Sequence, residues 1–368
     1  MANLGDITLV IPAYNRPAYL ERQIDYWSRT DVHLCILDGS TKSAPQSLIE
    51  RMGKNVHYQH LPIGFNERLV LACDLVQTKY VALLGDDELY SVQGLKDCIE
   101  TLESDSRLIA CVGRALFFYH RDDAIYGDQV YEQNATPDGV FDNDIVRLNE
   151  SFQNGNPDKA PYLLYGIFRT PDWKRVVRVS YGRWYSSGYV YELAFQIFGT
   201  LLGPAVTVDS LVWLRSGENP AMSSAAVNRK IPMGEWGSDP QYLNELVDFV
   251  DRIVSEKIKD ATSTRSELKE VVTQVVKEFT AYSLHKPKRL KAKWHQILYF
   301  LNSVTPKFIK KALKRNMTPT IGKLLDYRGR SMADALLLME GRGIKFDSSE
   351  MKELEQFLRD FHRKLELN

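Results

Sequence analysis

The first third of the chain alternates between short apolar runs and segments in which apolar residues recur every three or four positions. The apolar runs are typical of buried strands and predict strands over 7–11, 32–37, 56–58, 80–84 and 108–112. The helical spacing between them predicts helices that begin near Pro17, Leu48, Gly64 and Val92. This strict alternation with short links predicts an α/β fold with a doubly wound, mostly parallel sheet.

The regular pattern ends near residue 121. Residues 121–161 are rich in Asp, Asn, Gly and Pro, and we expect a long loop that is functional or mobile. Apolar and aromatic residues return over 162–213, with a helix near 191–198 and a strand near 205–214. A polar, Pro-containing segment over 216–233 is then a predicted lid.

From residue 241 onward the apolar spacing is helical again. We therefore place a domain boundary near residue 238. The expected organisation is a domain over 1–238, with halves of about 1–120 and 121–238, followed by a helical C-terminal appendage over 239–368.

Composition narrows the picture only a little. The chain has 368 residues with 47 Lys plus Arg and 47 Asp plus Glu, so its net charge indicates no partner. Its four cysteines are scattered without a CxxC pair and are expected to be reduced core residues. No signal-peptide pattern and no run of 18 apolar residues is present. A cytoplasmic protein is expected.

Three acids, Asp86, Asp87 and Glu88, follow the predicted strand over 80–84. Ligands of open α/β sheets bind outside the carboxyl ends of the strands, and hard oxygen ligands there suit Mg²⁺ or Mn²⁺ shared with a substrate diphosphate. The alternative is an ordinary polar turn in which Asp86 or Asp87 caps the helix that starts near Ser91.

The first two strand ends carry further polar groups. Tyr14 and Asn15 follow the first strand, and Asp38 follows the second. No GxGxxG follows the first strand, which argues against a dinucleotide-binding domain, and the absence of GxxxxGK[ST] excludes a P-loop. An aromatic side chain next to an amide suits the binding of a nucleotide base. A lone aspartate suits an N–H group of that base, and an acid cluster suits a metal-bound diphosphate.

Three motifs together resemble the inverting glycosyltransferases of family 2, which have the GT-A fold. They are Ile-Pro-Ala-Tyr-Asn-Arg over 11–16, Leu-Asp-Gly-Ser over 37–40 and the acids over 86–88. The resemblance covers roughly residues 5–215. It implies a nucleotide-binding half over 1–120 and an acceptor half over 121–238. It also implies a metal-dependent transfer of a sugar from a nucleotide-sugar donor to a hydroxyl of a glycan or lipid-linked acceptor in surface polysaccharide synthesis. A UDP-linked donor is the first expectation.

The resemblance also assigns roles to individual residues of the nucleotide half. Pro12, Tyr14 and Asn15 would line the nucleotide pocket. Asp38 would accept a hydrogen bond from the base N–H, and Arg68 would face the nucleotide or its phosphates.

One position departs from the family pattern. Gly85 stands where family members often have the first Asp of Asp-x-Asp-Asp. By resemblance Asp87 is the metal ligand, and Asp86 contacts the ribose or supports the metal site. Gly85 leaves open how many protein ligands the metal has, and whether it is bound mainly through the substrate.

An inverting transfer needs a base beside the acceptor hydroxyl, and by resemblance this base is Glu192, which opens a predicted helix. A first-turn Glu that interacts only with the helix dipole is the alternative, and Asp172 and Asp209 are competing candidates for the base. Arg215 is expected to contact the donor phosphates, although a solvated loop Arg would fit the sequence nearly as well.

Residues 286–315 contain ten Lys or Arg and no acids, interleaved with apolar and aromatic residues. A basic amphipathic helix of this kind is typical of membrane-surface binding. A nucleic-acid patch and an ordinary solvated face are the alternatives. We favour the membrane surface, because the resembled family often glycosylates lipid-linked acceptors, and expect no nucleic-acid partner.

Two other functions stay open at the level of sequence. A sugar nucleotidyltransferase would use a similar α/β domain, but Ala13-Tyr14-Asn15-Arg16 does not supply the Gly-rich basic loop expected after its first strand. A non-catalytic scaffold of a glycan-assembly complex is supported only by Gly85.

Overall fold

The computed structural model describes residues 2–157, 160–219, 231–261, 263–285 and 330–367. All five strands predicted in the first third are present, and the fifth continues to Arg121. The strands are β1 (Ile7–Ala13), β2 (His33–Asp38), β3 (Val56–His60), β4 (Tyr80–Leu83), β5 (Leu89–Tyr90), β6 (Ala110–Arg121), β7 (Ala124–Val130), β8 (Ile167–Arg169), β9 (Ala205–Ser216) and β10 (Arg330–Ser331).

The predicted helices are also present, and several begin at the residue types that favour a helix start. Pro17 opens the first one, and the Ser91 hydroxyl caps another by accepting from Gly94 N. The longer helices are α1 (Pro17–Trp27), α2 (Gln46–Ile49), α3 (Phe65–Leu75), α4 (Val92–Ser104), α5 (Asp144–Ser151), α6 (Thr170–Tyr181), α7 (Tyr189–Leu202), α9 (Met233–Ser238), α10 (Leu243–Lys257), α11 (Arg265–His285), α15 (Met332–Gly341) and α16 (Ser348–Leu367).

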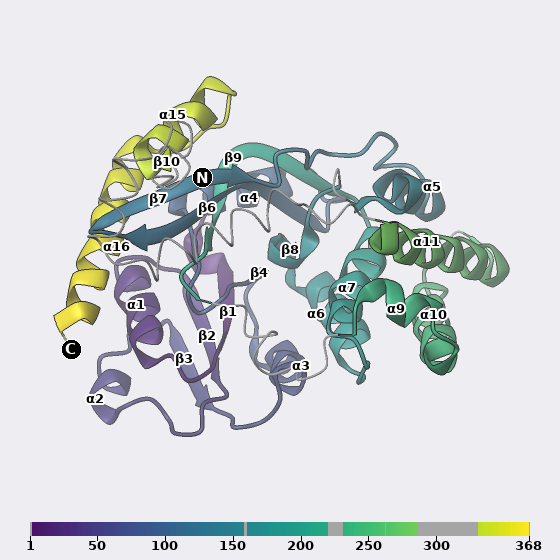
Figure 1. Ribbon diagram of the computed structural model, residues 1–368, viewed down its shortest axis with the longest axis horizontal. Helices are drawn as coiled ribbons and strands as arrows, with labels where there is room; N and C mark the ends of the chain where they lie inside the picture. Colours follow the sequence, from purple (N-terminus) through teal and green to yellow (C-terminus); the bar gives the residue numbers. More distant parts are fainter. Residues whose placement is uncertain (1, 158–159, 220–230, 262, 286–329, 368) are drawn as a thin grey trace, which may run out of the picture.

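The strands of the described residues form one sheet, in the order β10-β7-β6-β8-β4-β1-β2-β3, with β9 beside β6 and β5 beside β9. β3, β2, β1 and β4 are parallel neighbours, and β9 runs parallel to β6. β7, β8, β5 and β10 join antiparallel. The α/β fold class is confirmed, with the antiparallel strands in the half beyond β4 (Figure 1).

Alternate residues of the central strands pack on opposite faces of the sheet, as a period of two requires. In β1, Leu9 and Ile11 pack in one buried cluster with residues of α1 and α4. Val10 packs in the other, with residues of α3, α6 and α7. Because both faces are covered, these strands are apolar throughout, and their polar groups gather where the strands end.

The expectation of a long loop over 121–161 is wrong, because the segment contains β7 and α5. Arg121 pairs with Ala124, so Asp122 and Asp123 form a two-residue hairpin turn with φ of 50° and 57°. Positive φ at both central positions is the type I′ turn, which usually carries Asn and Gly. Because Asp-Asp is not the usual sequence of this turn, the hairpin was not recognised from the sequence.

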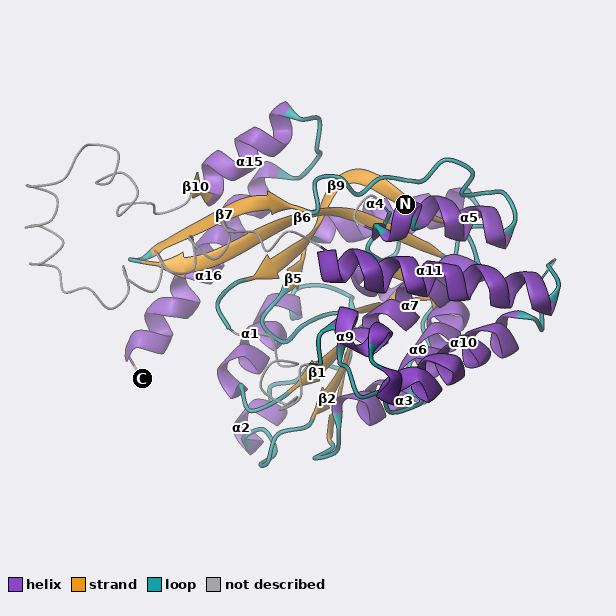
Figure 2. Ribbon diagram, turned by 45° about the vertical axis from the view of Figure 1, so that its right-hand side comes forward, coloured by secondary structure: helices purple, strands orange, loops and turns teal. Residues whose placement is uncertain are grey.

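The C-terminal helices pack in two separate places. α10 and α11 share a buried cluster with α6 and α7. α15 and α16 instead cover β6, β7 and β9 at the other end of the sheet (Figures 1 and 2). The division at residue 238 remains a prediction, but the described helices beyond it bury their apolar faces against elements before it.

The structure also bears on the cysteines and on possible membrane-spanning helices. All four cysteines are buried and unpaired, as expected. None of the helices in the described ranges has both the length and the apolar character needed to cross a bilayer. The basic segment over 286–315 and most of the predicted lid lie outside the described residues.

Candidate active site

The ends of β1, β2 and β4 meet at one edge of the sheet, because these strands are parallel neighbours. Gly39 N, just past β2, donates to Ala13 O at the end of β1. Tyr14 N, just past β1, lies 3.4 Å from Asp86 Oδ2, just past β4. Three of the polar stretches singled out in the sequence therefore form one site.

The turns after β1 and β2 hold each other. Asn15 has a φ of 53°, its N–H donates to Ser40 Oγ at 2.7 Å, and its Oδ1 accepts from Thr41 N at 3.2 Å. Pro12, two residues before Tyr14, is buried inside β1. Tyr14 keeps 40% of its surface exposed. The turn thus presents an aromatic ring at the surface of a rigid corner.

Asp38 is almost fully buried and already has two hydrogen-bond donors. Its Oδ1 accepts from Ser40 N at 2.9 Å, and its Oδ2 accepts from the Tyr58 hydroxyl at 2.8 Å. A carboxylate has about four lone-pair positions, so capacity for a further donor such as a base N–H remains.

Arg68 binds the strand ends themselves. Its Nη1 donates to Ala13 O at 2.7 Å and to Leu37 O at 2.6 Å, and the side chain is 2% exposed. A Cβ at Gly39 would lie 2.5 Å from its Cζ, so only glycine leaves room for the guanidinium there. In this geometry Arg68 fixes the strand ends that carry the site, and its contact with the nucleotide remains a prediction.

The acid cluster is neutralised by an arginine that we did not predict as a site residue. Arg16 Nη1 lies 2.9 Å from Asp86 Oδ1 and 3.3 Å from Asp87 Oδ2. Burial and the neighbouring Asp87 raise the pKa of Asp86 to about 6, although Arg16 opposes this shift. The interpretation of Asp86 or Asp87 as a helix cap is wrong, because Ser91 caps α4.

Asp87 is the acid best placed to meet a cation. Its Oδ2 accepts from Asn219 Nδ2 at 3.0 Å, and burial raises its pKa despite this bond and Arg16. Among the described residues, no group of three or more His, Cys, Asp or Glu could hold a metal ion. A Mg²⁺ or Mn²⁺ at Asp87 would have to take further ligands from the substrate phosphates and water, and metal binding remains a prediction.

The position of the Glu88 side chain explains why residue 85 is a glycine. The Glu88 carboxylate turns back toward Gly85 N, at 3.3 Å, and a Cβ at position 85 would lie 2.9 Å from its Oε2. Glu88 is 7% exposed, and burial, reinforced by Asp87, raises its pKa to about 8. An acid side chain at position 85 would compete for the space that Glu88 occupies.

Glu192 lies in the first turn of α7, as predicted. The Tyr162 hydroxyl donates to its Oε2 at 3.1 Å. The residue is exposed to solvent, yet enough protein surrounds the carboxylate that burial raises its pKa, opposed by Tyr162 and by the charge of Arg215. A raised pKa suits a group that must accept a proton near neutral pH.

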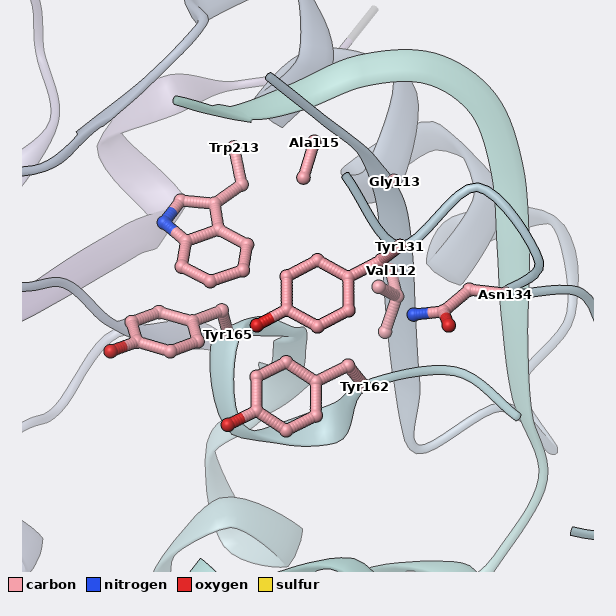
Figure 3. Close-up of a pocket in the computed structure, with 8 residues that line it drawn as sticks. All are labelled: Val112, Gly113, Ala115, Tyr131, Asn134, Tyr162, Tyr165 and Trp213. Carbon is pink, nitrogen blue, oxygen red and sulfur yellow. The ribbon is translucent and has the colours of Figure 1, made fainter. Parts of the chain in front are cut away.

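Four aromatic rings form a cluster beside Glu192: those of Tyr131, Tyr162, Tyr165 and Trp213. They line a small cavity with Val112, Gly113, Ala115 and Asn134, and Figure 3 shows the Tyr131 ring between Trp213 and Tyr162. Burial raises the pKa of Tyr165 strongly, and both Glu88 and Glu192 add to the shift. The charges of both carboxyl groups therefore affect the same tyrosine of this cluster.

Arg215 stands beside this cluster, with its Cζ 5.7 Å from the Tyr131 ring centre and 5.9 Å from that of Trp213. Its charge lowers the pKa of both Glu88 and Glu192. The arginine thus adds a positive charge beside the ring cluster, and its phosphate contact remains a prediction.

The competing bases have other surroundings. Asp209 lies on β9 and binds Arg114 Nε at 2.9 Å and Nη2 at 2.6 Å. Asp172 opens α6, where burial raises its pKa. Of the three candidates, Glu192 is the one whose hydrogen-bonding tyrosine belongs to the ring cluster.

Several residues that shape the site were not predicted from the sequence, namely Arg16, Arg22, Tyr162, Glu218 and Asn219. Arg16 adjoins the Tyr14-Asn15 motif and was within reach of that reasoning. The other four reach the site only through tertiary packing, so no local pattern identifies them.

These features define a class, an α/β domain with carboxylates and cations at the carboxyl ends of its strands, where open α/β sheets bind their ligands. Residues 8–163 match the family model described as glycosyl transferase family 2. Over these residues the chain is similar to family 2 of the glycosyltransferases, which confirms the resemblance seen in its motifs. The match includes Asp38 and Asp87 and ends before Glu192 and Arg215.

No curated protein matches the chain. Among solved structures, it is similar to S. aureus TarS 1-349, at 13% identity and a TM-score of 0.47, over 96% of this chain and 91% of that one. It is also similar to S. aureus TarS 1-349 in complex with UDP-GlcNAc, at 14% identity and a TM-score of 0.48, over 93% of each chain. At these values the likeness does not bear on substrate or mechanism.

Proposed function

We propose that this protein is an inverting glycosyltransferase that moves a sugar from a nucleotide donor, UDP-linked in the first instance, to a hydroxyl of a glycan or lipid-linked acceptor. The observation that carries the proposal is the ring cluster itself: Trp213 pairs with Tyr90 just past the acid turn, and Tyr162, 6.3 Å from Trp213 between ring centres, donates to Glu192. This arrangement supports a donor diphosphate near the acids and a candidate base at the far end of the cluster, with the sugar between them.

In the proposed reaction, Tyr14, Asn15 and Asp38 hold the base and Asp86 lies near the ribose. Asp87 would hold Mg²⁺ or Mn²⁺, which stabilises the charge on the leaving diphosphate when bound. Because Arg16 contacts Asp87 Oδ2 in this structure, the arginine would have to move toward the phosphates for the carboxylate to take up a cation.

Glu192 takes the proton of the acceptor hydroxyl while the oxygen of that hydroxyl forms a bond to the anomeric carbon of the sugar. The bond between that carbon and the diphosphate oxygen breaks on the opposite face, so the anomeric configuration inverts. The charge of Arg215 lowers the pKa of both carboxyl groups, and this arginine would add positive charge near the negative donor.

Transfer from a panel of nucleotide sugars, UDP-GlcNAc among them, in the presence of Mn²⁺ tests the proposal. Glu192→Gln keeps an acceptor for the Tyr162 hydroxyl but cannot take a proton. Its single-turnover rate should fall roughly 10²–10⁴-fold, with donor affinity near that of the parent. Asp172→Asn is the matched control, since Asp172 also opens a partly buried helix. A parental rate for Glu192→Gln, or a comparable fall for Asp172→Asn, would contradict the assignment.

A scaffold would bind a nucleotide without transferring or hydrolysing any donor. Asp87→Ala adds a second discrimination, because loss of the carboxylate should abolish Mn²⁺-dependent UDP binding in a folded protein. If UDP affinity with Mn²⁺ is unchanged in this variant, Asp87 is not the metal ligand. The cytoplasmic location and the membrane contact through 286–315 remain predictions.

A further inference from the structure

The last helix of the chain returns to the nucleotide site. α16 lies beside β7 and α1 (Figure 1), and α1 follows directly on the Tyr14-Asn15 turn. Ring pairs join the two helices, since Phe361 lies 5.1 Å from Tyr19 and Phe357 lies 5.5 Å from Tyr26, measured between ring centres. A segment more than 180 residues beyond the family match therefore packs against the first helix of the site.

A line of buried polar contacts runs from this helix to the acid cluster. His362 Nε2 hydrogen-bonds to Glu218 Oε1. The other carboxylate oxygen of Glu218 accepts from Arg22 Nη1 at 2.8 Å. Arg22 Nη2 donates in turn to the backbone carbonyl oxygen of Asp87 at 2.5 Å. The side chains of Arg22 and Glu218 are 0% and 4% exposed.

The charges along this line are held in place from several sides. The Arg22 guanidinium packs against the rings of both Tyr19 and Phe361, with its Cζ 4.6 and 4.7 Å from the two ring centres. Burial alone would raise the pKa of Glu218, but the hydrogen bond to His362 and the charge of Arg22 outweigh it and hold the pKa below its usual range. The His362 ring also stacks on that of His120, 4.0 Å away. Glu218 therefore stays ionised, and its carboxylate has one well-defined position.

The position of Glu218 matters because the next residue touches the proposed metal ligand. Asn219 Nδ2 donates to Asp87 Oδ2 at 3.0 Å. Asp87 is thus held twice through Glu218: at its carboxylate by Asn219 and at its backbone carbonyl by Arg22.

We propose that α16 is a positioning element of the donor site, and that His362, acting through Glu218, orients Asp87 for the donor diphosphate. His362 touches neither substrate nor cation in this assignment and is a positioning residue. The inference rests on the proposed function, because the donor site is the one assigned above.

The test compares four proteins: the parent, His362→Ala, His362→Gln and Arg363→Ala. Gln restores a hydrogen-bond donor near the place of Nε2. Arg363 is the matched control, because it lies on the same helical turn but pairs with Asp123 at the surface. Binding of UDP with Mn²⁺ is measured by calorimetry, with donor KM and kcat from the transfer assay and a melting curve for each protein.

His362→Ala should raise the Kd for UDP and the donor KM about fivefold to thirtyfold, as expected from losing one hydrogen bond to a charged group, with kcat at saturating donor near the parent value. His362→Gln and Arg363→Ala should stay near the parent. Amide hydrogen exchange over 216–219 should quicken in His362→Ala alone. A purely structural role would instead lower the melting temperature and the active fraction while leaving KM unchanged.

An unchanged Kd in folded His362→Ala would overturn the inference while leaving the proposed function intact. No nucleotide binding by the parent would refute the proposed function, and the inference with it. If His362→Ala does not fold, Glu218→Gln provides the same test, since it keeps the shape of the side chain and removes its charge. The same rise in Kd is then expected, and its absence would equally overturn the inference.

Discussion

Glu88→Gln should make the folded protein more stable at neutral pH. In the parent, Glu88 is buried with a pKa of about 8, against 4.5 for an ordinary Glu. A carboxyl group whose pKa is raised on folding binds its proton more tightly in the folded state. Its contribution to stability is therefore fully present below the unfolded-state pKa and is lost as pH rises toward 8. Glutamine resembles the protonated acid and does not titrate.

The magnitude follows from the size of the shift. Each pH unit between about 4.5 and 8 removes about 1.4 kcal/mol from the parent. Between pH 5 and pH 7 the stability advantage of Glu88→Gln should therefore grow by about 2 to 3 kcal/mol. Using the change between two pH values cancels any fixed difference in hydrogen bonding between Glu and Gln.

The assay is urea unfolding of both proteins at pH 5 and pH 7, followed by tryptophan fluorescence. Glu353→Gln, at an exposed position on α16, is the control and should show little change between the two pH values. If the difference between parent and Glu88→Gln is the same at pH 5 and pH 7, Glu88 does not carry a raised pKa. A neutral Glu88 could then not explain how three neighbouring acids would tolerate the proposed donor diphosphate.

Two further predictions concern neighbouring groups. Asp38→Ala should weaken binding of the nucleoside diphosphate by about 1–3 kcal/mol, measured by calorimetry. Tyr58→Phe removes only one of the contacts of Asp38 and should weaken binding less. Equal affinity of Asp38→Ala and the parent would count against a contact between Asp38 and the nucleotide base. Tyr162→Phe removes a hydrogen bond that lowers the pKa of Glu192, so the acidic limb of the pH–rate profile should move to higher pH; an unmoved limb would show that this bond does not tune the base.

The parts of the fold that local pattern determines were predictable. Buried strands with apolar residues on both faces, followed by acids or amides, gave β1, β2 and β4 and the residues at their ends. The β6–β7 hairpin was not recognised, because Asp122 and Asp123 adopt positive φ where Asn and Gly are expected. Helix α5 was missed as well, although Asn143 caps it by accepting from Val146 N.

The site was predicted where a residue follows its own strand, and missed where a partner comes from elsewhere in the chain. Asp87 and Glu192 follow from motifs, whereas the Glu218 pairing with His362 joins residues 144 positions apart. The meaning of Gly85 also needed the structure, because the reason is the place taken by the Glu88 carboxylate. Local spacing carries no information on such contacts.

The placement of β9 limits where this chain can be cut. β9 lies after residue 163, yet it pairs with β6 and β5, and Ser91 N and Oγ hydrogen-bond to the carbonyl oxygens of Val212 and Leu211. A fragment that stops at the end of the family match would leave the edge of β6 open and remove Trp213 from the core. The recognisable segment is therefore shorter than the smallest unit able to fold, and limited proteolysis should yield stable pieces only when they retain 205–216.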